Sequence, residues 1–136
     1  MAAPNIVGVV TVTGITTALN VTTTPTVFLG NAVNSGKVMK VNSIIVSNID
    51  GTSAADINIK YHTASAVGAG TSISLAHTIS VAADSTLVAL DKASTIYVQE
   101  GQSLVSYASA NGDLDITCSY EEISSWGKIN DTVIFF

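Results

Sequence analysis

The sequence predicts an all-β protein built as an antiparallel β-sandwich, with either jelly-roll or immunoglobulin-like strand order. Val, Ile and Thr dominate the 136 residues, whereas Glu, Lys and Arg, which usually fill helix surfaces, are scarce. Apolar and polar residues alternate with a period of two in several segments. These segments follow one another at spacings of about 8 to 12 residues, with turn-forming residues between them and no helical stretch.

The first element is a long stretch without charge, because the first charged side chain of the chain is Lys37. Residues 5–29 hold two threonine-rich, β-prone segments. We expect residues 1–35 to form an extended N-terminal arm whose strands add either to this chain's own sheet or to a neighbour's. An uncharged extended edge that stayed bare would template aggregation, so it must be paired.

The body of the sandwich is placed at residues 36–123. Alternation predicts strands at residues 56–62, 72–81 and 113–120. In the second of these, one inward face is expected to carry the alternate residues Ile73, Leu75, His77, Ile79 and Val81. Runs that are apolar on both faces predict better-covered strands at residues 38–46, 86–90, 96–98 and 104–108.

Residues 124–136 form a different kind of segment, with the chain's one tryptophan and two closing phenylalanines. An apolar terminus of this length is usually docked onto something. We therefore expect a C-terminal tail that anchors the protein to another subunit.

Charge excludes several classes of function. Only 11% of the residues are charged, the net charge is −5, and there is no arginine, so a nucleic-acid partner is not expected. A surface with so few charges favours coverage by other copies or by another protein. The apolar runs are too interrupted for a membrane-spanning helix, and no signal segment is recognised, so a membrane partner is not expected. No cofactor is expected either.

The stretch "SNIDGTSAADINIKYH", residues 47–62, raises the question of a calcium loop. Asn48, Asp50 and Asp56 could supply oxygen ligands, but their spacing does not match a twelve-residue calcium loop with its terminal glutamate. The preferred interpretation is a hairpin connection with Asp50 and Gly51 at the positive-φ positions of a tight turn. No metal site is predicted here.

The remaining reactive side chains do not form a catalytic pattern. His77 is expected to be a core or interface histidine, and His62 to be exposed beside Lys60. Cys118 is expected to be a buried, inert thiol, and alone it forms no disulfide within the chain. No enzyme is predicted, although His62 or His77 binding a metal across a symmetry axis stays open.

Several pieces of the sequence resemble a family of small β-sandwich virion proteins of tailed bacteriophages, especially phages of marine cyanobacteria. The most specific are "VSNIDGTSAAD", "VAADSTLVALDK", "IYVQEGQSL" and "CSYEEI". The resemblance covers residues 5–123, so the tail after Ile123 departs from it. It implies a non-enzymatic structural protein of the particle, such as a capsid decoration or cement protein, located in the virion after assembly in the host cytoplasm.

These observations lead to one expected function and two alternatives. We expect a homo-oligomer, with trimers favoured, that bridges major capsid protein or other virion subunits. The alternatives are a neck, tail or fibre component, and a glycan- or calcium-dependent adhesion module. The expected subunit contacts come from the two ends: Ile6, Val7, Val9, Val27, Phe28, Trp126, Val133, Ile134, Phe135 and Phe136.

Overall fold

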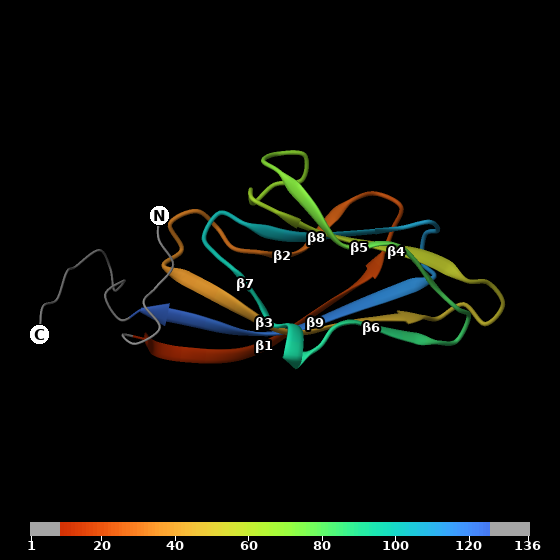
Figure 1. Cartoon of the computed structure of the whole chain (residues 1–136), viewed down its shortest axis with the longest axis horizontal. Helices are drawn as coiled ribbons and strands as arrows, with labels where there is room; N and C mark the ends of the chain where they lie inside the picture. Colours follow the sequence, from red (N-terminus) through yellow and green to blue (C-terminus); the bar gives the residue numbers. More distant parts are fainter. Residues whose placement is uncertain (1–8, 126–136) are drawn as a thin grey trace, which may run out of the picture.

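A computed structural model describes residues 9–125. It shows an all-β fold in which two antiparallel sheets pack face to face, as predicted (Figure 1). The elements in chain order are β1 (Val9–Val21), β2 (Thr26–Gly30), β3 (Lys37–Asn48), β4 (Ala55–His62), β5 (Ser72–Val81), β6 (Thr86–Leu90), a single 3-10 turn (Lys92–Ser94), β7 (Ile96–Val98), β8 (Ser103–Ala108) and β9 (Leu114–Ser125).

The strand order is that of a jelly roll. The five-stranded sheet runs β1-β9-β3-β6, with β7 also pairing with β3, and the four-stranded sheet runs β2-β8-β4-β5. The pairs β1 with β9, β2 with β8, β3 with β6 and β4 with β5 are nested, as though one long hairpin had been rolled up. This nesting decides between the two strand orders that the sequence left open.

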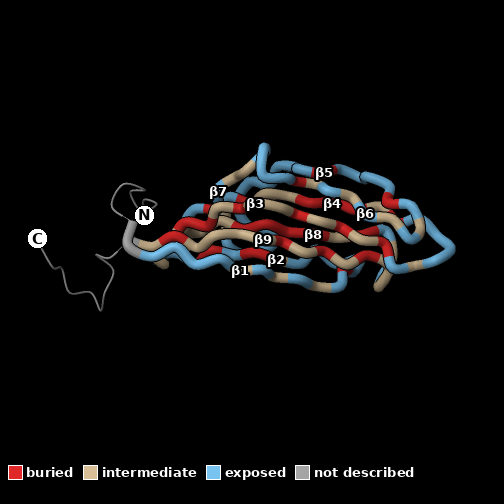
Figure 2. Tube along the Cα trace, turned by 90° about the horizontal axis from the view of Figure 1, so that it is seen from below, coloured by how far each residue is buried: buried red, intermediate tan, exposed pale blue. Residues whose placement is uncertain are grey.

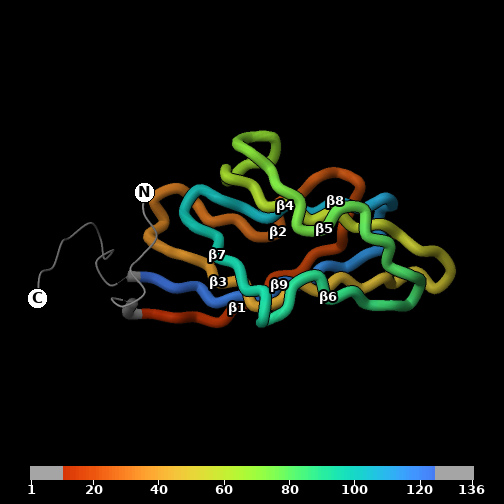
Figure 3. Tube along the Cα trace, viewed as in Figure 1, coloured from red at the N-terminus to blue at the C-terminus, as the bar shows by residue number. Residues whose placement is uncertain are grey.

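Residues 9–30 are part of the two sheets. β1 pairs with β9 along its whole length, and β2 pairs with β8. Of the two destinations expected for this segment, the chain's own sheets are the one observed. Figure 3 shows the start of β1 beside the end of β9, which agrees with the pairing of Val9 and Ser125.

The core forms where the inner faces of the two sheets meet. One row of inward side chains crosses the five-stranded sheet through Leu19, Ile116, Val46 and Leu87. The four-stranded sheet contributes side chains such as Ile57, Ile59 and Leu104, which are fully buried. Apolar burial of this kind is the main stabilising term of the fold. Figure 2 shows the buried positions along the central strands, with exposed positions along β1 and β5 at the two margins.

Candidate functional site

Within residues 47–62, a polar turn at residues 49–54 joins the end of β3 to β4, and side chains of Asn48 and of the turn itself hold it together. Asn48 is 4% exposed, and its Nδ2 donates to the carbonyl oxygens of Ser53 and Val81, both at 2.9 Å. The Oδ1 of Asn48 accepts from the backbone N–H of Asp50 at 2.8 Å. The Oδ1 of Asp50 in turn accepts from the backbone N–H and the hydroxyl of Thr52, both at 2.8 Å. These oxygens therefore order the backbone, as Asx turns do.

The prediction of a hairpin at this point is wrong in two respects. β3 lies in the five-stranded sheet and β4 in the four-stranded sheet, so the segment crosses between sheets instead of joining paired strands. Asp50 and Gly51 are also absent from the residues with positive φ within 9–125. The buried Asn48 side chain bonds Asp50 and Ser53 within the crossover and Val81 at the end of β5, so this connection is ordered without Asp50 or Gly51 in a left-handed conformation.

The third candidate oxygen ligand, Asp56, lies apart from this turn on β4. Its backbone N–H donates to the hydroxyl of Ser109, and its carbonyl accepts from the N–H of the same residue. Across residues 9–125, no three His, Cys, Asp or Glu side chains come close enough to hold a metal ion. Nothing in this geometry favours calcium-dependent adhesion through residues 47–62.

The expected inward face of β5 is not formed. Ile73, Leu75 and Ile79 are 56%, 42% and 40% exposed, and His77 is exposed as well, whereas Ala76 and Val81 are buried. Two shifts in the pairing of β4 with β5, one of them at Thr78, whose φ is 51°, interrupt the period of two, so Leu75 and His77 lose the inward positions and Ala76 takes one. Ile79 still lies opposite the buried Ile57, and Ile73 lies opposite Tyr61, because the second shift restores the face that the first reversed. These two side chains are exposed because β5 is the edge of its sheet.

The expectation for His62 is also wrong, because its side chain is only 7% exposed. Its Nδ1 is buried and has no hydrogen-bond partner among the described residues. The expectation for Cys118 is confirmed: the thiol is fully buried, and burial raises its pKa to about 12.

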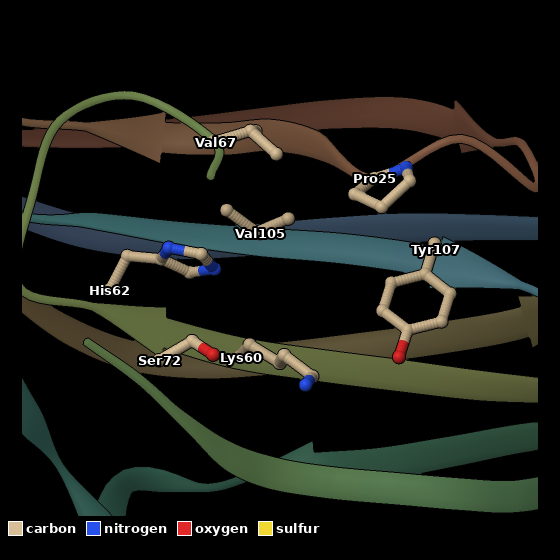
Figure 4. A pocket seen from close by; sticks show the side chains of 7 residues that line it. All are labelled: Pro25, Lys60, His62, Val67, Ser72, Val105 and Tyr107. Carbon is tan, nitrogen blue, oxygen red and sulfur yellow. The ribbon is translucent and has the colours of Figure 1, made fainter. Parts of the chain in front are cut away.

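His62 lines a pocket on the outer face of the four-stranded sheet (Figure 4). The register places Lys60 opposite Val105 and His62 opposite both Ser103 and Ser72, and opposed residues share a face. Tyr107 lies two residues beyond Val105 on the same face. The pocket has a volume of about 210 Å³ and is lined by Pro25, Lys60, His62, Val67, Ser72, Val105 and Tyr107.

The loop between β4 and β5 covers one side of this pocket. Its ends are joined by hydrogen bonds between Thr63 and Thr71, and the hydroxyl of Ser103 donates to the carbonyl of Ala64 at 2.7 Å. Figure 4 shows the loop arching over the sheet with Val67 on its inner side. This cover explains why Val105 is 1% exposed although its side chain points out of the sandwich.

The lining carries positive charge and hydrogen-bond donors without a carboxylate. Lys37 and Lys40 are paired with Glu122 and Glu121 at 3.0 and 3.7 Å, but Lys60 makes no ion pair within residues 9–125. In Figure 4 the His62 ring points toward the middle of the pocket, with Tyr107 at the opposite end. No motif in the sequence marks this site, because its residues come from three strands, β4, β5 and β8, and from two connecting segments.

The residues expected at subunit contacts are in different situations. Phe28 is 6% exposed and belongs to this chain's own core, so its side chain is not available to another subunit, and Val27 is half-buried. Val9 lies at the start of β1. The other predicted contacts lie outside the described residues: Ile6, Val7, Trp126, Val133, Ile134, Phe135 and Phe136.

The edges of the two sheets offer another kind of contact surface. β1 is an edge strand of 13 residues with no charged side chain, and no strand within residues 9–125 pairs with its outer edge. β5 is the edge of the other sheet, and its ten residues include no Lys, Asp or Glu. Edge strands are normally protected by charge, proline, short length or bulges. β1 has no charge, no proline and 13 residues, whereas β5 has only its two bulges as protection.

Comparison with known proteins supports the fold. A solved structure from a study of Bacillus endospore appendages, described as a novel family of disulfide-linked pili, matches with a TM-score of 0.51 and 13% sequence identity. The match covers 85% of this chain and 88% of that one. No protein-family model matches the chain, and the comparison with curated proteins gives no match. At this level of identity the likeness shows a common fold alone. Within residues 9–125 no helix is long and apolar enough to cross a membrane.

Proposed function

We propose that this protein is a structural subunit that assembles through its sheet edges, and that it serves in a phage virion as a capsid decoration or cement protein. The observation that carries the proposal is the uncharged edge of β1. Its outward N–H and C=O groups form a ready-made template for a strand from another chain.

Exposed apolar side chains support assembly as well. Ile73, Leu75 and Ile79 lie exposed on β5, and Val88 of the neighbouring β6 is 58% exposed. Burying such side chains against a partner would contribute about 25 cal/mol for each Å² removed from water, before the cost of association. A second contact of this kind on the opposite margin from β1 would let each subunit join two neighbours.

Assembly would be non-covalent. The pilus proteins that share the fold are described as disulfide-linked. This chain has one cysteine, Cys118, and it is fully buried between the sheets. A disulfide to a neighbour would require the core to open, so strand addition and apolar contact are the available means.

The virion setting rests on the resemblance of the sequence to small phage structural proteins and is compatible with the jelly-roll fold, which is common in viral capsids. A fold alone does not determine function. In this proposal many copies bridge adjacent coat subunits and resist the internal pressure of packaged DNA. Trimers would fit positions of local threefold symmetry in the coat.

A second candidate is a fibre, tail or neck component. The specific observation that favours it is the edge strand itself, since head-to-tail strand addition that does not close on itself produces a filament. The pilus subunit with the same fold is a precedent for such a polymer.

Charge on the free edge tests the assembly step. The double variant Thr11→Lys/Thr13→Lys places two lysines on β1, and Thr23→Lys/Thr24→Lys places the same charge in the β1–β2 loop as a control. We expect sedimentation velocity to show loss of oligomers in the first variant and not in the second. Equal oligomerisation of both variants and the unchanged protein would overturn a role for β1.

The location in the particle needs a separate measurement. Immunogold labelling and quantitative mass spectrometry of purified virions would give the position and the copy number. Hundreds of copies over the head would support decoration. About six or twelve copies at one vertex would support the neck or tail, as expected for closed rings. Absence from the particle would refute both.

A further inference from the structure

We propose that the pocket on the outer face of the four-stranded sheet binds a small organic carboxylate through Lys60 and His62. This function goes beyond assembly and does not depend on it. The pocket lies among strands β4 and β8, the start of β5 and the loop residues Pro25 and Val67, and it is distinct from the free edge of β1.

The buried imidazole of His62 is the first argument. Buried polar atoms in native proteins are almost always hydrogen-bonded, so one without a partner calls for an explanation, and a bound ligand is one. His62 is 7% exposed, its Nδ1 has no partner within residues 9–125, and its ring lines the pocket. The loop that follows His62 is held to β8 by the hydrogen bond from Ser103 to Ala64, so the cover of the pocket is tied down beside the ring.

The charge of the lining selects an anion. Lys60 brings a full positive charge, and Ser72 and Tyr107 bring hydroxyl donors. No carboxylate lines the pocket, and Lys60 makes no ion pair with any described residue. An anion placed here would therefore gain charge-assisted hydrogen bonds that no side chain of the protein already occupies.

The same lining favours a carboxylate over a phosphate. Phosphate sites are typically built from arginine, from helix N-termini or from successive free backbone N–H groups. The chain has no arginine, and the residues around this pocket that belong to β4 and β8 have their backbones paired within the sheet. A single lysine matches the single charge of a carboxylate.

The apolar part of the lining requires an organic body on the ligand. Pro25, Val67 and Val105 and the ring of Tyr107 form the side of the pocket away from Lys60 (Figure 4). A volume of about 210 Å³ lies below the roughly 300–1,000 Å³ of pockets that hold drug-sized ligands. The ligand is thus a small acid with one ring or a short apolar body.

Binding can be tested with two matched pairs of probes: benzoate with its neutral analogue benzamide, and glucuronate with glucose. Ligand-observed saturation-transfer NMR suits the test, because it works whether or not the protein is assembled. We expect at least one of the acids to bind with a dissociation constant on the order of 1 mM, as one charge-assisted contact and a small apolar body allow. Its neutral partner should bind at least about tenfold more weakly.

Variants connect the binding to this pocket. Lys60→Gln should weaken the acid at least about tenfold, whereas Lys92→Gln, which removes the same charge from an exposed residue of the 3-10 turn, should leave binding unchanged. Both variants are checked for an unchanged melting temperature in the absence of ligand. The proposal fails if neither acid binds at about 50 mM, fifty times the expected dissociation constant. It also fails if the neutral analogues bind equally well, or if the two lysine variants behave alike.

Discussion

Asn58 of β4 and Thr78 of β5 are joined across the bulge that separates the two halves of β5. The Oδ1 of Asn58 accepts from the backbone N–H of Thr78 at 2.9 Å and from its hydroxyl at 3.4 Å. Thr78 has a φ of 51°, a conformation that costs a β-branched residue about 1–2 kcal/mol. The Asn58 side chain therefore replaces the ladder bond that the bulge removes and holds the strained residue in place.

Replacing Asn58 with Ala should destabilise the fold. Asn58 is 7% exposed, and its loss leaves the Thr78 N–H without this acceptor. We expect the free energy of unfolding to fall by about 2 kcal/mol, measured by urea denaturation. Ser80→Ala, at an exposed position of the same strand, is the control and should change it by less than about 0.5 kcal/mol. A similar effect of both substitutions would show that the side chain of Asn58 does not hold the bulge.

Thr52 controls the protonation of Asp50. Hydrogen bonds from the backbone N–H and hydroxyl of Thr52 hold the pKa of the Asp50 carboxyl below its ordinary value of 3.8. Because the lowered pKa belongs to the folded state, this contribution to stability is present above pH 3.8 and is lost as the pH falls through the folded-state pKa. Thr52→Val removes the hydroxyl and should raise the Asp50 pKa in a carboxyl NMR titration. Thr71→Val, on an exposed threonine elsewhere, should leave it unchanged.

Cys118 should resist thiol reagents in the native protein. Its side chain is fully buried, and a pKa of about 12 leaves a thiolate fraction of only about one in ten thousand at pH 8. Iodoacetamide at pH 8 should give no mass increase until guanidinium unfolds the chain, when one adduct should form. Reducing agents should likewise leave any oligomers intact. Rapid labelling without denaturant, or oligomers that dissociate under reduction, would contradict the buried position and the non-covalent assembly derived from it.

The strand pattern of the sequence predicted most of the fold because burial in β9 follows local alternation, and Ile57 and Ile59 of β4 are buried as their alternation predicted. The apolar residues of β9, from Leu114 to Tyr120, face the core at every second position, as expected. The nested strand order was not predictable to the same degree. Whether β1 joins β9 of its own chain or of another depends on contacts more than a hundred residues apart in the sequence, such as Thr16 with Ser119.

The candidate site escaped prediction for a related reason. The burial of His62 depends on a loop that folds back because Ser103 bonds Ala64, and no pattern within residues 56–62 signals that bond. The exposure of Leu75 and His77 likewise depends on bulges in the pairing with β4. A single shift reverses the faces of a strand, so periodicity fails where distant polar contacts set the register.

The cover of the pocket can be tested by comparing two glycines of the β4–β5 loop. Both have positive φ, +84° at Gly68 and +67° at Gly70, so a substitution to Ala strains either backbone by about 1–2 kcal/mol. A Cβ at Gly68 meets nothing within 4 Å, but one at Gly70 would lie 2.6 Å from the Oγ1 of Thr63 and 3.0 Å from the Cβ of Ala64. Gly70→Ala should therefore displace the loop and destabilise the protein more than Gly68→Ala does. Amide hydrogen exchange should show increased exchange at residues 62–64 in the Gly70 variant only, because these residues depend on the closed loop. If exchange there rises equally in both variants, backbone strain alone explains the change and the close packing of Gly70 against Thr63 is not what holds the cover over His62.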